Sequence, residues 1–197
     1  MQNNNDIQRI QQMTFNPETV AQREFVESHA SEILLFTDNI LRIINNPDAE
    51  FRIYFSNNPN VPEDEAILTL QLNNANINNF NNVIQMRLYM NNGRLSIDTK
   101  DMNVRDIGGN FSDRDYVNIL SGIMSSAKSF ILNQHNAILA TLTDQDEIND
   151  ENLRYGILSG FIEQVINQTH HLHFTTIQGN NSIKNTNTLN KQPGKGK

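Results

Sequence analysis

The sequence contains no cysteine among its 197 residues, and it also lacks tryptophan. Disulfide bonds, cysteine-ligated zinc and catalysis by a thiol are therefore excluded. No phosphate-binding loop is present, because Gly108-Gly109 is not followed by Lys-Ser or Lys-Thr. The Gly-x-Ser-x-Gly elbow of serine hydrolases is absent as well. The chain therefore carries none of these common catalytic motifs.

Long apolar runs are also missing, and none approaches the length of a membrane span. The opening residues, Met1 to Asp6, lack the basic-then-apolar order of a signal peptide. We therefore expect a soluble protein with no membrane partner. Its expected location is the cytoplasm, or outside the cell by an export route that needs no such leader.

Negative charge dominates most of the chain, whose formal net charge is −7. Residues 181–197 hold four lysines and no acid, so they carry +4; by subtraction, residues 1–180 carry −11. An acidic body binds nucleic acid poorly, because phosphate affinity comes mainly from lysine and arginine. A ribosomal RNA partner would have to meet a local basic patch or the tail, whereas a protein partner has no such requirement.

The N-terminal part reads as a tail followed by a helix. Residues 1–14 are polar, and we predict a frayed segment there. Apolar residues at steps of three and four predict a helix from Pro17 to Asn45. Pro47 disfavours helix in the residue before it, so the helix is expected to end at this point.

The middle of the chain reads as strands with one apolar face each. Alternating apolar and polar residues predict strands at 51–55 and 66–72, separated by a loop. An asparagine-rich connection over 73–82 follows. Two further runs flank Asn91-Asn92-Gly93, which tolerates the positive φ angles of a tight hairpin turn. These runs predict strands at 83–90 and 94–99.

The C-terminal half reads as two helices and a tail. Helical periodicity covers residues 116–140, and a polar break at 143–149 precedes a final helix that Asp150 is expected to cap. Residues 180–197 predict a disordered basic tail. The order of elements predicts an α+β fold in one domain over residues 15–179. Its sheet, antiparallel or mixed, would follow an N-terminal helix and precede a helical C-terminal half.

Three of the five histidines fall within four positions, at His170, His171 and His173. On a helix His170 and His173 would share a face with Glu163, seven residues earlier. A metal site needs further donors that the sequence does not place, and a polar helix end explains the same residues. We therefore predict neither a metal nor a cofactor. The acids between 144 and 151 are interpreted as a solvated, helix-capping loop.

Four collinear segments, spanning about residues 15–180, carry a family resemblance. They are Phe25-Val26-Glu27-Ser28, Leu68-Thr69-Leu70-Gln71-Leu72, Gly108-Gly109-Asn110-Phe111, and Leu172-His173-Phe174 with Ile177-Gln178-Gly179. Read in order, they resemble the A-chain fold of ribosome-inactivating proteins, the adenine-specific rRNA N-glycosidases typified by ricin and Shiga toxin. The resemblance implies that adenine stacks between two tyrosines while a glutamate stabilises the oxocarbenium-like sugar and an arginine stabilises the departing base.

The family's site positions carry altered residues in this chain. Aligned without gaps, the glutamate falls on His170, the arginine on His173, and the second tyrosine on Phe111, with Tyr116 as a nearby substitute. The first tyrosine falls on Asn78, with Phe80 beside it, or on Tyr89 if a gap is allowed. An imidazole cannot supply negative charge to an oxocarbenium ion, and Glu163 is the nearest acid on that helical face.

Two functions therefore stay open. The first is a domain related to rRNA N-glycosidases with an altered active centre, whose partner is ribosomal RNA and which is a hydrolase only if that centre works. The second is a non-enzymatic acidic module that binds a protein, such as a secretion chaperone or an exported effector. The resemblance makes the first the leading hypothesis, and the acidic body is the sequence feature that favours the second.

Overall fold

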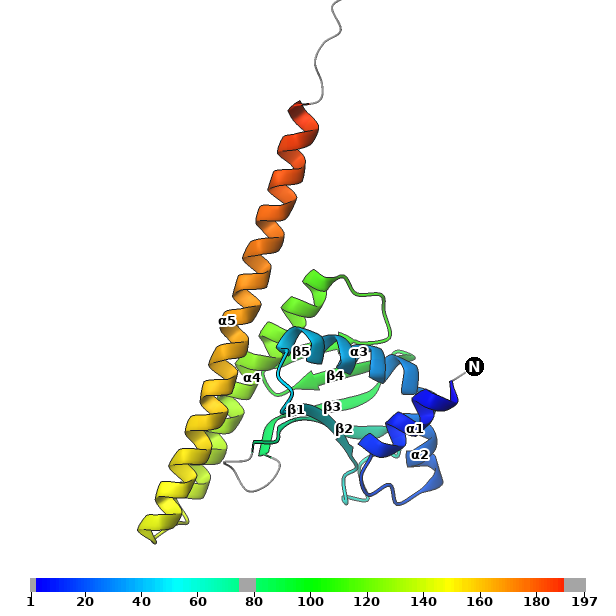
Figure 1. Ribbon diagram of the computed structural model, residues 1–197. Helices are drawn as coiled ribbons and strands as arrows, with labels where there is room; N and C mark the ends of the chain where they lie inside the picture. Colours follow the sequence, from blue (N-terminus) through cyan, green and yellow to red (C-terminus); the bar gives the residue numbers. More distant parts are fainter. Residues whose placement is uncertain (1–2, 75–80, 190–197) are drawn as a thin grey trace, which may run out of the picture.

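A computed structural model of the chain describes residues 3–74 and 81–189, with side chains as far as Leu172. Three helices precede a sheet, and two long helices follow it (Figure 1). The elements are α1 (Asn4–Met13), α2 (Val20–Ser28), α3 (Ala30–Ile44), β1 (Ala49–Tyr54), β2 (Glu65–Leu72), β3 (Asn81–Asn91), β4 (Arg94–Thr99), β5 (Met102–Asp106), α4 (Asp113–Leu139) and α5 (Gln145–Leu189). The predicted α+β class is confirmed. Within the described ranges, no helix has the length and apolar character needed to cross a bilayer.

The sheet is an antiparallel meander in which each strand pairs with the next, in the order β1-β2-β3-β4-β5. One face is apolar and buried, because cross-strand partners such as Ile53, Leu68 and Met86 share it. Helices α1, α3 and α4 contact the sheet. The main core lies between them; its sheet side consists of Phe51, Ile53, Leu68, Leu70, Met86, Leu88, Leu95 and Ile97.

The predicted strands are confirmed, and the sheet contains one more. The β3–β4 turn has positive φ at Asn92 (51°) and Gly93 (75°), as expected for the Asn-Gly pair. Strand β5 was not predicted from the sequence. It is a short edge strand that pairs only with β4, and three of its five residues are exposed. An edge strand with one partner needs little apolar periodicity, so its sequence gave a weak signal.

Helix α1 occupies Asn4–Met13, so the frayed segment predicted over residues 1–14 was wrong for these residues. Ile7, Ile10 and Met13 recur every three residues in α1, and Ile10 is fully buried in the core. The chain then joins the sheet edge, where the Phe15 backbone N–H donates to the Ile53 carbonyl at 2.8 Å. This apolar stripe has only three residues in an otherwise polar segment, so the segment as a whole was interpreted as a tail. The stripe is nevertheless enough to pack α1 on the core.

The predicted helix from Pro17 to Asn45 is two helices that meet at His29. Thr19 begins α2 with a capping box, in which its hydroxyl accepts from the Gln22 backbone and the Gln22 side chain accepts from the Thr19 backbone. His29 has φ −110° and ψ 17°, which is not helical, and it separates α2 from α3. Asn45 ends α3 in the left-handed conformation, before Pro47.

Helix α5 starts earlier than predicted and runs antiparallel to α4. The Asp144 carboxylate accepts the backbone N–H groups of Asp146 (2.9 Å) and Glu147 (3.1 Å), so the predicted cap at Asp150 was wrong. Asp150 lies inside the helix instead. Figure 1 shows α5 extending beyond the rest of the fold. The helix includes residues 180–189, the first part of the tail predicted over 180–197. Residues 190–197 lie outside the described residues.

We predict that Ile10→Ala lowers the free energy of unfolding by about 2–4 kcal/mol, because it leaves a cavity under α1. Urea unfolding followed by circular dichroism measures this change. The control is Leu35→Ala in α3, where the side chain is 56% exposed and a change within about 0.5 kcal/mol is expected. Equal effects of the two substitutions would mean that α1 contributes nothing to the core.

Candidate functional site

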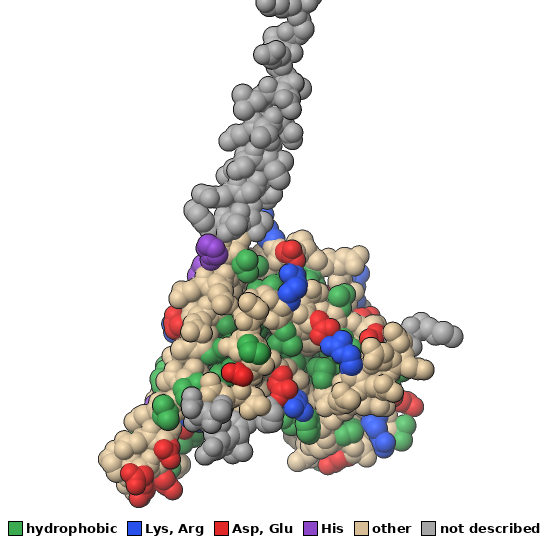
Figure 2. Space-filling model, in the orientation of Figure 1, with side chains coloured by type: hydrophobic (Ala, Val, Ile, Leu, Met, Phe, Trp, Pro, Cys, Tyr) green, Lys and Arg blue, Asp and Glu red, His purple; other side chains and the backbone are tan. Residues whose placement is uncertain are grey.

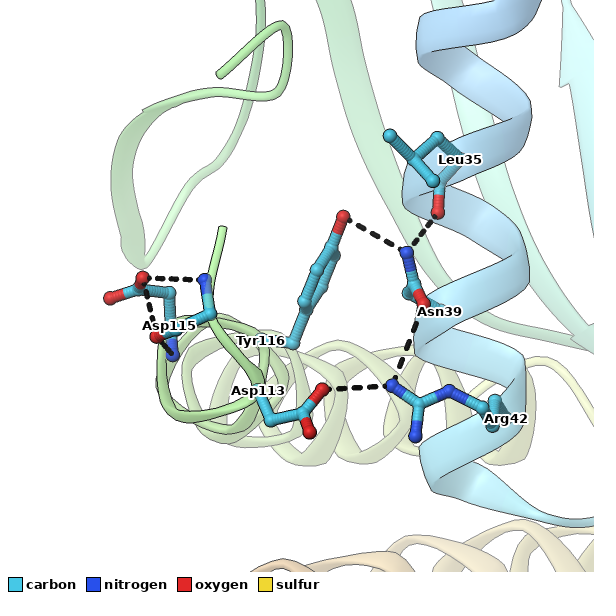
Figure 3. Close-up of polar contacts among 7 residues, drawn as sticks. Leu35, Asn39, Arg42, Asp113, Asp115 and Tyr116 are labelled. Carbon is cyan, nitrogen blue, oxygen red and sulfur yellow. Dashed lines mark hydrogen bonds and ion pairs between the residues drawn. The ribbon is translucent and has the colours of Figure 1, made fainter. Parts of the chain in front are cut away.

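Two of the residues expected to stack on adenine lie together at the start of α4. The Phe111 ring meets the Tyr116 ring edge-on, with centroids 5.4 Å apart. Tyr116 is only 4% exposed, and its hydroxyl accepts a hydrogen bond from Asn39 Nδ2 at 3.2 Å (Figure 3). Phe36 lies on another side of the same ring, at 6.4 Å. Tyr116 is therefore a core residue, and a base could stack on it only if this part of the core opened.

Polar contacts join α3 to the beginning of α4 at the same corner of the fold. The Arg42 guanidinium donates to Asp113 at 3.0 Å, and Asn39 lies one turn before it on α3 (Figure 3). Ser112 and Asp115 form the capping box of α4. Hydrogen bonds from the Ser112 side chain and backbone lower the pKa of the Asp115 carboxyl. These contacts hold the start of α4 against α3. Arg42 also lies beside the end of α5 that carries the predicted histidine cluster.

The histidine end of α5 borders a cavity of about 340 Å³ at this corner. Arg42 and Ile43 line it from α3, and His171 and Leu172 line it from α5. His170 is exposed on α5. The backbone of His173 belongs to α5, but its side chain lies outside the described residues. Arg42 and His171 thus line the same cavity, whereas His170 is not among its lining residues.

The expected acid and the other expected aromatic lie elsewhere. Glu163 pairs with Lys128 of α4 at 3.1 Å, and both side chains are more than half exposed. Asn78 and Phe80 lie outside the described residues. Tyr89, the alternative to Asn78, donates its hydroxyl to Asp98 at 3.1 Å on the sheet face opposite the buried Leu88. Phe111 and Tyr116 are thus brought together, but neither Glu163 nor Tyr89 joins them.

A buried ionic cluster, missed by sequence reasoning, connects α4 to the first turns of α5. Glu151 Oε1 lies 3.0 Å from His135 Nδ1, and its carboxylate accepts two hydrogen bonds from Arg154, at 2.7 and 2.8 Å. The His135 ring stacks on Tyr155 with centroids 4.2 Å apart. Arg154 also donates to Asn81 at the start of β3, at 3.2 Å. We call Glu151, His135 and Arg154 the ionic cluster.

Opposing effects act on the charge of Glu151. Burial is the largest single effect and raises the pKa of its carboxyl. The hydrogen bonds and charges of Arg154 and His135 together lower this pKa by more than burial raises it, so the net pKa is lowered. Interpreting residues 144–151 as a solvated loop was therefore wrong for Glu151, whose side chain is 6% exposed. Sixteen residues separate it from His135, and only the packing of α4 on α5 brings them together.

An open groove lies where α1 and α2 meet the ends of β2 and β3. Its volume is about 700 Å³; Ile7, Phe25 and Met90 provide its apolar lining. The acids Glu24, Glu27 and Asp64 line it too. Glu27 accepts a hydrogen bond from Gln11 at 2.8 Å, whereas Glu24 and Asp64 form no ion pair with any residue that the structure describes. We call this surface the acidic groove.

The described histidine, aspartate and glutamate side chains include no group of three placed to hold a metal ion. No family model, no curated protein and no solved structure matches the chain. Function is therefore inferred from the geometry of these sites alone. The acidic groove, at about 700 Å³, is larger than the cavity of about 340 Å³ at the histidine end of α5.

We predict that Glu151→Gln lowers the free energy of unfolding at pH 7 by about 3 kcal/mol, because Arg154 then loses its buried countercharge. The folded-state pKa of Glu151 is lowered, so its stabilising charge is fully present above the usual carboxyl pKa of about 4.3. That contribution is lost as the pH falls through the folded-state pKa. The difference between variant and wild type should therefore shrink in acid, as measured by urea unfolding across pH.

The matched control is Glu163→Gln, which breaks an exposed pair between the same two helices. We expect it to change the free energy of unfolding by less than about 1 kcal/mol. A Glu151→Gln effect of the same small size would show that the ionic cluster contributes nothing particular to stability.

Proposed function

We propose that this chain is a non-enzymatic protein-binding module and that the acidic groove holds a basic, partly apolar segment of its partner. The single observation that supports this is the combination in one groove of an apolar lining with carboxylates that have no cationic partner among the described residues. The volume, about 700 Å³, accommodates several side chains at once.

The negative charge of the chain indicates that the partner segment is basic. Residues 1–180 carry a formal charge of −11, so the field around the body attracts cations and repels nucleic acid. Within the groove, Glu24 and Asp64 are exposed, whereas Phe25 is only 6% exposed. Lysine or arginine side chains would meet the carboxylates, while apolar side chains between them would cover Phe25 and Ile7.

Acidic side chains also gather at the free end of the α4–α5 hairpin (Figure 2). These are Asp144, Asp146, Glu147 and Asp150, all exposed. Over the rest of the face seen in Figure 2, several acidic side chains lie next to basic ones. The hairpin end lacks the apolar lining of the groove, so it serves as the reference surface in the experiment below.

An rRNA N-glycosidase with an altered centre is the second proposal. It is favoured by Arg42 and His171, which line one cavity at the corner where Phe111 and Tyr116 lie. It is disfavoured by the burial of Tyr116 and by the ion pair that holds Glu163 toward Lys128. At this corner Asp113 pairs with Arg42 and Asp115 with Ser112, so neither of these carboxylates is free to stabilise an oxocarbenium ion.

We predict that a synthetic amphipathic peptide, with leucine and lysine at helical spacing, binds the protein and that salt weakens the complex. The double variant Glu24→Lys/Asp64→Lys should weaken binding at least about tenfold, because two attractive contacts become repulsive. Fluorescence anisotropy of the labelled peptide measures this.

The matched control is Asp146→Lys/Asp150→Lys, which changes the net charge equally at the hairpin end and should leave affinity within about twofold once salt screens long-range attraction. Equal weakening by both double variants would mean that binding depends on the net charge of the protein and not on the acidic groove. Absence of binding would contradict the proposal.

Incubation with purified ribosomes distinguishes the two proposals. We expect no release of adenine, measured by chromatography of the small-molecule fraction, because Tyr116 is not available for stacking. Adenine release above that of a buffer control would favour the glycosidase, provided that His171→Ala, which alters the cavity at the corner, reduces it. Release that is unchanged by this substitution would place the activity at another site.

A further inference from the structure

The chain separates its charges into an acidic body, residues 1–180, and a basic end. All 22 acidic residues lie in the body, whereas residues 181–197 contain four lysines and no acid. Residues 189–197, which we call the C-terminal segment, hold Lys191, Lys195 and Lys197 after Leu189. A basic, partly apolar segment of the kind proposed for the acidic groove is therefore part of the chain itself.

The lysines and arginines of the body are largely occupied by the acids of the same body. Seven of these eleven side chains form ion pairs there, namely Arg9, Arg42, Arg52, Arg87, Arg94, Lys128 and Arg154. In the acidic groove, by contrast, Glu24 and Asp64 pair with no cation among the described residues. The lysines that complement these two carboxylates are thus those of the basic end.

The direction of α5 separates the C-terminal segment from the groove of its own copy. Helix α5 leaves the fold on the side away from α1 and α2, beside which the groove lies (Figure 1). Between Leu172 and Leu189 it rises by about 26 Å, at about 1.5 Å per residue. Residues 190–197 can span at most about 29 Å more. The helix therefore directs the segment towards another molecule.

We infer that the acidic groove binds the C-terminal segment of a second copy of this chain. The inference rests on the proposed function, since it names the partner of the same groove. Lysines of the segment would pair with Glu24 and Asp64, while Leu189 would cover the partly exposed Ile7 and Met90. Because every copy carries both a groove and a segment, two copies can exchange segments and form a closed dimer.

Sedimentation velocity of the full chain tests this inference. We expect a monomer–dimer equilibrium at micromolar concentrations in about 0.1 M salt, and a shift to monomer in about 1 M salt, where the Debye length falls from about 10 Å to about 3 Å. Lys191→Glu/Lys195→Glu should raise the dissociation constant of the dimer at least about tenfold. A chain that stays monomeric at about 300 μM in low salt, or a dimer unaffected by this double variant, would overturn the inference.

A charge swap locates the contact. Glu24→Lys/Asp64→Lys should weaken the dimer as much as the segment variant does, because each turns attraction into repulsion. All four substitutions in one chain place glutamates opposite lysines, and should restore the dissociation constant to within about threefold of wild type.

The matched control for the swap combines the segment variant with Asp146→Lys/Asp150→Lys at the hairpin end. It has the same net charge as the four-substitution groove variant, and all the substituted acids are exposed. We expect no restoration of the dimer in the control. Restoration by the control, or failure of the groove substitutions to restore the dimer, would show that the segment does not bind in the acidic groove.

A labelled peptide of residues 181–197 separates this inference from the proposed function. It is titrated, by fluorescence anisotropy, into the full chain carrying Lys191→Glu/Lys195→Glu, whose own segment competes little. We expect binding that Glu24→Lys/Asp64→Lys weakens at least about tenfold. If the leucine–lysine peptide binds the groove and this peptide does not, the inference fails while the proposed function stands. If neither peptide binds, both fail.

Discussion

Burial of the single apolar face of the antiparallel sheet is the constraint on which the rest of the structure depends. Side chains such as Leu68, Met86 and Ile97 cannot remain in water, so α1, α3 and α4 are held against the sheet. Every surface discussed above lies where a covering helix meets a strand or another helix. The acidic groove, for example, lies beside α1 and α2.

Helix α5 is in turn held in place by packing on α4. Leu158, Ile162 and Val165 form a buried stripe on α5 that continues to Thr169. Near the start of the same helix, a buried position is occupied by Glu151 instead of an apolar residue. Its charge is tolerated because its carboxylate contacts Arg154 and His135. A buried ion pair of this kind adds less stability than an apolar contact would, but removing one partner leaves the other charge buried without compensation. Arg154 also donates a hydrogen bond to Asn81, so the same side chain contacts β3.

The two candidate functions make different demands on the same molecule. A glycosidase needs aromatic rings free to stack and a carboxylate near the sugar, but Tyr116 is committed to the core and Glu163 to Lys128. A binding module needs only an accessible surface with complementary chemistry, which the carboxylates and apolar lining of the acidic groove provide. The physical difference is preorganisation, because catalysis requires fixed groups at short range whereas recognition of a basic segment tolerates exposed, movable side chains.

Local pattern in the sequence was enough for the fold class, the first four strands, the Asn-Gly turn and the body of α4, because alternation and helical periodicity act over a few residues. The charge asymmetry between body and tail is likewise a property of the sequence alone. Tertiary structure decided that Ile10 is core, that Glu151 is buried while its acidic neighbours are solvated, and that Tyr116 is enclosed. Each of these depends on contacts between distant segments, whose free energy no local pattern contains.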